Sequence, residues 1–317
     1  MKRVFENPKS VRVLYLGTPE IAVLPLERLL TAGFSVVGVV SQEDKRAGRN
    51  GSKLEVPAVK QAALAHSLPV FQPHRIREDY SFAKALSFDV IVCMAYGQIV
   101  PTGFLNLAPY GAINLHASLL PHLRGAAPIQ RAILEGEKES GVSLMEMVAV
   151  MDAGEVYDQT HVCIEENDTT TSLSQKMSLS AAEMIARDLL PYVNGTLKGV
   201  PQDESKVTFA KKILPEDEHL PLGMSCSATN RYIRALAELP GAYLFVEGKK
   251  LKIFSASFSS EAKTEVGTLL PTKSGLYLGC ADGTLKLEEV QYEGKKRMDA
   301  KSFLNGAHWN GERKFVH

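Results

Sequence analysis

Apolar runs of strand length alternate with amphipathic segments of helical spacing through the first two thirds of the chain. This alternation predicts strands and helices in turn, which is typical of an α/β domain with a doubly wound parallel sheet. The predicted strands span residues 11–16, 34–40, 89–94 and 111–116, and the predicted helices span 21–30, 56–65 and 81–86.

The pattern changes after a helix predicted from residue 172 to about 193. The segment 195–208 holds turn residues and no hydrophobic periodicity, which indicates a linker. A helical segment at 226–236 then precedes short apolar runs, at close spacing, that are typical of a small β-barrel. We therefore expect a first domain over residues 1–194, a linker over 195–208 and a C-terminal β-barrel over 209–317. The predicted barrel strands span 243–246, 251–255, 266–270, 275–279 and 284–290.

Composition supports two domains and says little about partners. The chain has 317 residues, of which 45% are hydrophobic, so it can bury more than one core. Its formal net charge is zero, but residues 206–317 hold 17 Lys and Arg against 13 Asp and Glu. This weak basic excess fits a polyanionic partner, and it also fits ordinary solvation.

Cysteine usage and the lack of targeting signals point to the cytoplasm. The four cysteines show neither a CxxC pair nor a metal-ligand spacing, and Cys93 falls in a strand that we expect to be buried. We find neither a signal-peptide core nor an apolar window long enough for a membrane helix. We therefore expect a reduced, cytoplasmic protein.

The first turn of the predicted sheet disfavours the common nucleotide sites. It reads Gly17-Thr18-Pro19-Glu20, and neither GxGxxG nor GxxxxGK[ST] follows any predicted strand. A nucleotide-dependent oxidoreductase or ATPase is therefore disfavoured, although the sheet topology alone would allow either.

Three polar side chains stand where open α/β sheets bind their ligands. Asn114 and His116 lie two residues apart at the end of the strand 111–116, so their side chains share one face. Residues 142–150 form another strand-like run, and Asp152 follows it beside a turn-forming glycine. Because ligands of such sheets bind at strand carboxyl ends, we expect the three side chains to serve one site.

An amide, an imidazole and a carboxylate suit acyl transfer through a tetrahedral intermediate. Asn114 can donate to the developing oxyanion. His116 can stabilise that oxyanion if it is cationic, or take the proton of an attacking amine if it is neutral. Asp152 can raise the pKa of His116 or relay a proton through water. Taken singly, each residue also fits a structural role, so the hypothesis depends on their combination.

That combination resembles the signature of the formyltetrahydrofolate-dependent formyltransferases, in which Asn-x-His is followed by Ser-Leu-Leu-Pro and a downstream Asp-x-Gly. Within that superfamily, the wording Arg-Gly-Ala-Ala-Pro-Ile-Gln at residues 124–130 is similar to the branch that acts on methionyl-tRNA. The similarity covers almost the whole chain in order. It includes residues 17–19, 70–73, 95–97, 114–116, 118–121, 152–154, 294–296 and 303–306.

The resemblance implies a Rossmann-like formyltransferase domain followed by a small OB-like β-barrel. It implies transfer of the formyl group of 10-formyltetrahydrofolate to the α-amino group of methionine on initiator tRNA, for translation initiation. Asn114, His116 and Asp152 carry over as catalytic residues. We expect a monomer without a metal. The candidate walls of the folate site are Met94, Tyr96, Gly97, Ser118, Leu119, Leu120 and Pro121.

The segment 43–53 is the first candidate for tRNA binding. It is rich in cations and small residues and has almost no apolar anchor, so we expect a mobile loop that contacts phosphate. A comparable loop in the resembled family inserts near the tRNA acceptor end, usually with the wording Asp-Arg-Pro-Ala-Gly-Arg. Here Lys45 and Arg46 replace the first arginine and the proline, so which side chain makes the specific contact stays open.

Lysines near the predicted strand turns of the barrel are the second candidate. An oligonucleotide-binding type of barrel would use them to hold the tRNA backbone, although ordinary surface lysine also explains each cluster. The predicted tRNA contacts of the chain are Lys45, Arg46, Arg49, Lys211, Lys249, Lys295, Lys296 and Arg297.

Three rivals remain. A sugar-nucleotide N-formyltransferase shares the catalytic residues and can carry a barrel, but its acceptor does not need the basic 43–53 segment. Glycinamide formyltransferases of purine synthesis resemble only the first domain. A catalytically inert RNA-binding protein on the same scaffold is disfavoured by the intact Asn114, His116 and Asp152.

Overall fold

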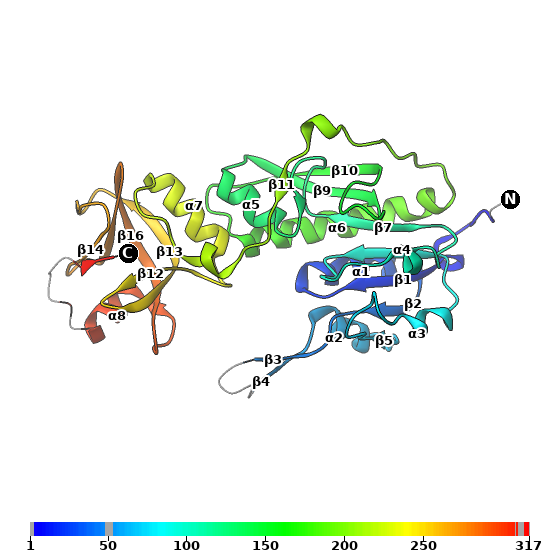
Figure 1. Cartoon of the computed structure of the whole chain (residues 1–317), viewed down its shortest axis with the longest axis horizontal. Coiled ribbons are helices and arrows are strands. Elements are labelled where there is room, and N and C mark those ends of the chain that lie inside the picture. Colours follow the sequence, from blue (N-terminus) through cyan, green and yellow to red (C-terminus); the bar gives the residue numbers. More distant parts are fainter. Residues whose placement is uncertain (1–2, 48–52, 308, 310–313, 317) are drawn as a thin grey trace. The chain divides into compact units, whose positions relative to one another are not determined.

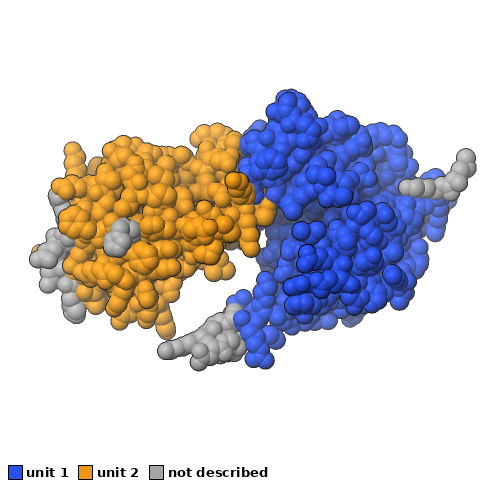
Figure 2. All heavy atoms as spheres, in the orientation of Figure 1, with its two compact units in different colours: residues 1–125, 139–163, 174–210 blue, residues 126–138, 164–173, 211–317 orange. Residues whose placement is uncertain are grey.

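A computed structural model of the chain describes residues 3–47, 53–307, 309 and 314–316. The chain forms two compact units, which Figure 2 shows in different colours. Unit 1 comprises residues 1–125, 139–163 and 174–210, and unit 2 comprises residues 126–138, 164–173 and 211–317. The segment 195–208 thus belongs to unit 1, whereas two short inner segments group with the C-terminal residues.

A seven-stranded mixed sheet forms the centre of unit 1 (Figure 1). Its strand order is β10-β9-β7-β6-β1-β2-β5, and the five strands from β7 to β5 are parallel. Strand β9 is antiparallel to β7, and β10 is antiparallel to β9. The bounds are β1 (Arg12–Gly17), β2 (Ser35–Val40), β5 (Val70–Phe71), β6 (Val90–Met94), β7 (Ala112–His116), β9 (Glu139–Glu146) and β10 (Val156–Cys163).

Helices cover both faces of this sheet. Leu14 and Leu16 of β1 join a buried cluster with residues of α3 (Ser81–Lys84) and α4 (Thr102–Leu105). Tyr15, which points to the opposite face, donates to the carbonyl of Ala22 just before α1 (Val23–Thr31). Helix α6 (Thr170–Val193) lies beside the start of α1, and α2 (Ala58–Ala65) packs on α1 and β2. Unit 1 is therefore a three-layer α/β structure.

Two small strand pairs accompany the main sheet. Strands β3 (Lys45–Ala47) and β4 (Lys53–Glu55) form an antiparallel pair, and β8 (Arg124–Gly125) pairs in parallel with β11 (Phe209–Ala210). The second pair joins residues that are 85 positions apart in the sequence. Its strand β11 directly follows residues 195–208, which were expected to form a linker.

Unit 2 contains an antiparallel barrel with the strand order β12-β13-β16-β15-β14-β18, and β17 pairs with β16. A bridge between Val246, at the end of β12, and Val316, directly after β18, joins the first and last strands in this order. The barrel is therefore nearly closed. Helix α7 (Cys226–Leu236) contributes Ile233 and Leu236 to the barrel core, and it packs on α5 (Pro128–Glu135). The other bounds are β12 (Ala242–Val246), β13 (Lys249–Ser259), β14 (Thr268–Pro271), β15 (Leu276–Cys280), β16 (Gly283–Tyr292), β17 (Met298–Asp299), α8 (Ala300–Ala307) and β18 (Lys314–Phe315).

The predicted fold class is confirmed, with one correction to the sheet. The sequence pattern predicted a parallel sheet, but β9 is antiparallel to β7. Strand β10 is antiparallel to β9 because the short connection 147–155 can join only an antiparallel pair. No helix among the described residues has the length and apolar character needed to cross a membrane.

Candidate active site

Asn114 and His116 project from the same face of β7. Their Cβ atoms share a face because they are two residues apart on one strand. His116 is 6% exposed and Asn114 is half-buried. Among the residues that the structure describes, none forms a hydrogen bond with the Asn114 side chain, so its amide is available to a substrate oxygen.

The hydrogen bond of His116 fixes its tautomer. Nε2 lies 3.0 Å from the carbonyl oxygen of Leu123, in a buried position. A carbonyl oxygen only accepts, so Nε2 carries the proton that is donated. In the neutral imidazole the lone pair is therefore on Nδ1, which lies 3.7 Å from Oδ1 of Asp152.

Asp152 lies in the connection between β9 and β10, which corrects the prediction that it follows a strand. The strand ends at Glu146, not at residue 150. Val150 and Met151 are 66% and 60% exposed, so this apolar run leaves the sheet instead of packing in it. Two hydrogen bonds fix the aspartate: Oδ2 accepts from the backbone N–H of Gly125 at 2.9 Å, and the backbone carbonyl accepts from Gln202 Nε2 at 2.8 Å.

Buried side chains form the floor of the site. Cys93 pairs with Asn114 across β6 and β7, and burial raises the pKa of its thiol to about 12, with a further contribution from the charge of Asp152. Burial also raises the pKa of the Tyr96 hydroxyl well above its usual value. Charges at Asp152 and at a protonated His116 are therefore screened less than they would be in water.

The seven predicted folate contacts lie in two segments of unit 1. The first segment follows β6: Met94 and Tyr96 have buried side chains, while Gly97 is exposed with φ of +86°. A Cβ at Gly97 would lie 2.1 Å from Gln42 Nε2, so the backbone and Gln42 approach each other closely here. The carbonyl of Tyr96 accepts from Thr18 Oγ1 and Gln42 Nε2. This segment therefore offers mainly backbone groups to a ligand.

The second segment follows β7. Ser118 and Leu120 are buried, and Leu119 and Pro121 are half-buried. Ser118 Oγ donates to the carbonyl of His122 at 2.6 Å, and Ser143 Oγ donates to the carbonyl of Ser118. These bonds hold the loop that leads from His116 to Leu123.

Two of the predicted tRNA contacts of unit 1 lie on the hairpin of β3 and β4. Lys45 and Arg46 are exposed on β3, and Arg49 lies outside the described residues. Asp44 anchors the base of the hairpin: Lys60 Nζ lies 2.8 Å from its Oδ2, and Gln72 Nε2 donates to its Oδ1 at 2.9 Å. These bonds hold the residue that precedes Lys45, so the start of β3 is fixed.

The predicted tRNA contacts of unit 2 comprise four exposed lysines and one arginine that forms ion pairs. Lys211, Lys249, Lys295 and Lys296 are exposed. Arg297 is half-buried and forms ion pairs with Glu238 at 3.0 Å and Glu289 at 2.6 Å. Its guanidinium also lies 4.2 Å from the ring centroid of Phe254. The four lysines are thus accessible, whereas Arg297 is engaged within the barrel.

The residues that fix the catalytic groups were not predicted from the sequence. Gln202 and Thr208 lie in the segment expected to be a linker, Gly125 was read only as part of a signature, and Leu123 was not singled out. The one available signal was polar residues in a segment without periodicity, and that pattern is also typical of solvated loops.

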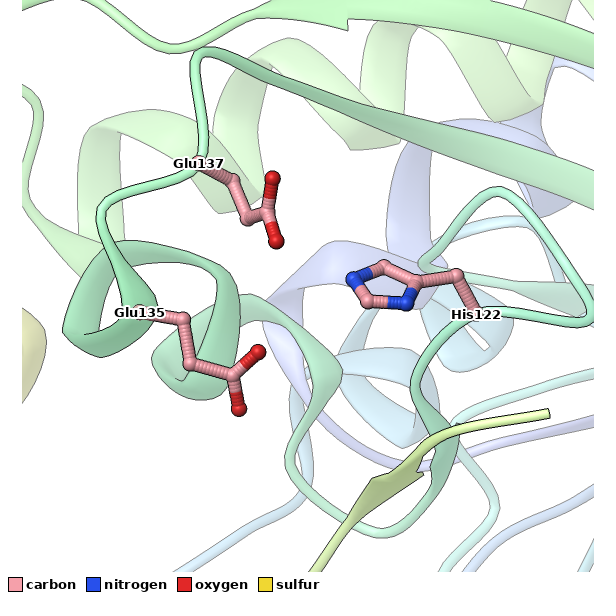
Figure 3. A group of neighbouring side chains, drawn as sticks. All are labelled: His122, Glu135 and Glu137. Atoms are coloured by element: carbon pink, nitrogen blue, oxygen red, sulfur yellow. The ribbon is translucent and has the colours of Figure 1, made fainter. Parts of the chain in front are cut away.

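Figure 3 shows the side chains of His122, Glu135 and Glu137. His122 belongs to unit 1 and the two glutamates belong to unit 2. We build no metal site on them, because exposed acidic groups often gather without an ion.

Two family comparisons match most of the chain. Residues 9–189 match the family described as Formyl transferase, and residues 212–308 match the family described as Formyl transferase, C-terminal domain. The methionyl-tRNA formyltransferase of Lactobacillus acidophilus is 42% identical over 298 residues, which cover 93% of this chain and 95% of that protein. The methionyl-tRNA formyltransferase of Symbiobacterium thermophilum is 43% identical over 302 residues, which cover 93% and 92%.

Solved structures share the fold at lower identity. A variant of HypX from Aquifex aeolicus has a TM-score of 0.69 and 17% identity, and the match covers 95% of this chain but only 48% of HypX, about half its length. The N-formyltransferase of Helicobacter canadensis, in complex with folinic acid and dTDP-3-aminofucose, has a TM-score of 0.66 and 19% identity over 87% of this chain and 99% of that one. At such identities the likeness shows the fold alone.

Proposed function

The chain belongs to the methionyl-tRNA formyltransferase family, and on that premise we propose which of its residues carry out the reaction. The enzyme formylates methionyl-tRNA, a step of translation initiation, and its family depends on a folate donor. The donor that we propose is 10-formyltetrahydrofolate, and the acceptor is the α-amino group of methionine on initiator tRNA.

Asn114, His116 and Asp152 are the proposed catalytic residues. The amine nitrogen attacks the formyl carbon, a C–N bond forms, and Asn114 donates to the oxyanion of the tetrahedral intermediate. His116 Nδ1 takes the proton that the amine loses. The bond from the formyl carbon to the folate nitrogen then breaks, and that nitrogen gains a proton as it leaves.

The observation that carries this assignment is the hydrogen bond from His116 Nε2 to Leu123. It leaves Nδ1 as the basic nitrogen of the neutral ring, on the side where Oδ1 of Asp152 lies 3.7 Å away. The carboxylate would stabilise the imidazolium that forms when Nδ1 takes a proton. Nδ1 of the neutral ring is therefore the proposed general base.

The donor is proposed to lie along the two segments that follow β6 and β7. Exposed backbone at Gly97 and half-buried Leu119 and Pro121 can form its walls. The tRNA is proposed to contact Lys45 and Arg46 on the hairpin, with Lys211, Lys249, Lys295 and Lys296 as backbone contacts of unit 2. The cytoplasmic location and the monomeric state remain predictions.

A substrate comparison tests the acceptor. Purified enzyme receives 10-formyltetrahydrofolate with methionyl-tRNA, with uncharged tRNA, or with an amino-sugar nucleotide, and formyl incorporation is followed. We expect incorporation with methionyl-tRNA only. Incorporation into the sugar alone would overturn the proposed acceptor.

Variants of the catalytic residues test the roles. His116→Ala and Asp152→Asn should lose turnover by at least about a hundredfold, while the dissociation constant for tRNA is retained. His161→Ala is the matched control, because His161 is an exposed histidine of the same unit that pairs with Glu139. Wild-type turnover in His116→Ala would refute the assigned base.

A further inference from the structure

The segment 200–210 of unit 1, which we call the strap, binds the turn at residues 122–124 and the backbone of Asp152. A bridge pairs Val200 with Val156, and β11 at its other end pairs with β8. Between these fixed ends, Gln202 and Thr208 direct their side chains to the peptides that hold Asp152 and His116.

Thr208 binds the turn whose Leu123 carbonyl accepts the hydrogen bond from His116. Its Oγ1 accepts from the backbone N–H of Leu123 at 2.8 Å, and its backbone carbonyl accepts from the N–H of Arg124 at 2.9 Å. Because Leu123 N–H is the donor in the first bond, the hydroxyl proton of Thr208 is available to His122 Nδ1, 2.6 Å away. Thr208 therefore binds consecutive residues of the 122–124 turn.

This turn needs such support because Leu123 has a φ of +59°. The left-handed region is unfavourable for a leucine and persists only where the surroundings enforce it. In this conformation the Leu123 carbonyl lies 3.0 Å from Nε2 of His116. If the Leu123 amide lost its acceptor, the turn would relax and the carbonyl would rotate away.

Gln202 holds the Asp152 side of the site. Its Nε2 donates to the carbonyls of Asp152 and Gly154, both at 2.8 Å, and its Oε1 accepts from Arg124 Nε at 3.0 Å. Asp152 also has a left-handed backbone, with φ of +53°. One side chain thus ties the aspartate loop to the residue that precedes Gly125, which itself binds the Asp152 carboxylate.

We propose that Thr208 and Gln202 are positioning residues of the formyl-transfer reaction: Thr208 sets the tautomer of His116, and Gln202 sets the place of the Asp152 carboxylate. The inference rests on the catalytic roles proposed above. It gives the segment between α6 and residue 211 a function in catalysis beyond that of a connection.

The first test reads the tautomer directly, without turnover. Enzyme labelled with ¹⁵N-histidine is observed by NMR, with the His116 signals assigned by their loss in His116→Ala. We expect the neutral ring to carry its proton on Nε2 in the wild type and in Thr208→Ser, which keeps the hydroxyl. We expect mixed tautomers in Thr208→Val, which has the same shape without a hydroxyl, and kcat lower by about tenfold or more with KM for the donor retained.

The second test reads the Asp152 side. In Gln202→Met, hydrogen exchange at the Gly125 amide should accelerate and kcat should fall about tenfold, while the His116 tautomer stays on Nε2. Asp203→Asn is the matched control on the strap, because among the described residues the Asp203 side chain binds only Ser205 and Lys206. It should leave both readouts unchanged.

The outcomes separate this inference from the proposed function. Wild-type turnover in His116→Ala would remove the catalytic role on which the inference rests. Loss of turnover in His116→Ala, together with a wild-type tautomer and kcat in Thr208→Val, would overturn the inference alone. A proton on Nδ1 in the neutral wild-type ring would also overturn it, and that measurement does not depend on the folding of any variant.

Discussion

The Asp152 carboxylate and the Gly125 backbone amide are joined by a hydrogen bond of 2.9 Å. Both residues have left-handed backbones, with φ of +53° for Asp152 and +124° for Gly125. A Cβ at Gly125 would lie 2.7 Å from the backbone oxygen of Ala210. Only glycine therefore allows β8 to approach β11 closely enough for its amide to bind the aspartate.

Gly125→Ala should separate this pair and reduce turnover. The added methyl group meets rigid backbone and the φ becomes strained, so we expect kcat to fall at least about tenfold and stability to fall by about 2 kcal/mol. Gly195→Ala is the control, since Gly195 has φ of +70° but nothing within 4 Å of its Cβ position. Steady-state kinetics and thermal melting measure both. Equal kcat in the two variants would show that the close approach is unimportant.

The fold was largely predictable because each element carries its own local pattern. Apolar alternation with helical segments predicted strands that became β1, β2, β6 and β7, and Ser225 caps the helix predicted at 226–236, where α7 begins at Cys226. Antiparallel β9 and β10 escaped prediction because strand direction is set by connections in space and not by local patterning.

The residues that position the site were not predictable for the same reason. Gln202 and Thr208 make hydrogen bonds to residues 48 to 86 positions away, and nothing in their neighbourhood signals such partners. The sequence beside Lys295 and Lys296 predicts Arg297 as a tRNA contact, which stays a prediction, and it gives no sign of the ion pairs of that side chain. The bonds of Arg297 to Glu238 and Glu289 exist only once the barrel has formed.

Lys45→Ala combined with Arg46→Ala should weaken tRNA binding without affecting the folate donor. Both side chains are exposed on an anchored hairpin, so the double variant loses up to two phosphate contacts and the slope of log K against log salt falls by about two. Titrations of labelled tRNA at several salt concentrations measure this slope. Arg77→Ala with Lys84→Ala removes the same charge from exposed positions elsewhere in unit 1 and should have little effect. An unchanged tRNA affinity in the hairpin variant would place the contact elsewhere.

Lys295→Ala with Lys296→Ala should lower tRNA affinity while the melting temperature is retained. Both lysines are exposed, and the two lost charges reduce a salt-sensitive contact with phosphate. Electrophoretic mobility shifts at two salt concentrations, with melting curves of the same samples, measure both properties. Loss of thermal stability without loss of affinity would assign these lysines to the barrel and not to the tRNA.

Arg297→Ala should show the reverse behaviour. Its guanidinium binds two carboxylates and lies over Phe254, so its removal leaves Glu238 and Glu289 facing each other without a counter-charge. We expect the free energy of unfolding to fall by about 1–3 kcal/mol and tRNA affinity to change little. A variant with wild-type stability and weakened binding would return Arg297 to the tRNA contacts.

Asp89→Asn should make stability less dependent on pH in acid. Asp89 is largely buried before β6, which by itself raises its pKa, but hydrogen bonds from the side chain and backbone of Arg12 outweigh burial, so the net pKa of Asp89 is lowered. A carboxyl whose pKa is lower in the folded state stabilises the fold fully above its unfolded pKa of about 3.9 and loses that contribution as pH falls through the folded value.

The wild type should therefore lose stability more steeply than Asp89→Asn below about pH 4, and it should be more stable by about 1–3 kcal/mol at pH 7. Melting temperatures of the two proteins are compared from pH 3 to pH 7. Their difference removes the contribution of the other carboxylates, which both proteins share. Glu183→Gln is the control, because Glu183 pairs with Arg28 on the surface, where an ion pair contributes little. If the wild type and Asp89→Asn gave parallel curves over this range, the charge of Asp89 would not be what holds the starts of β1 and β6 together.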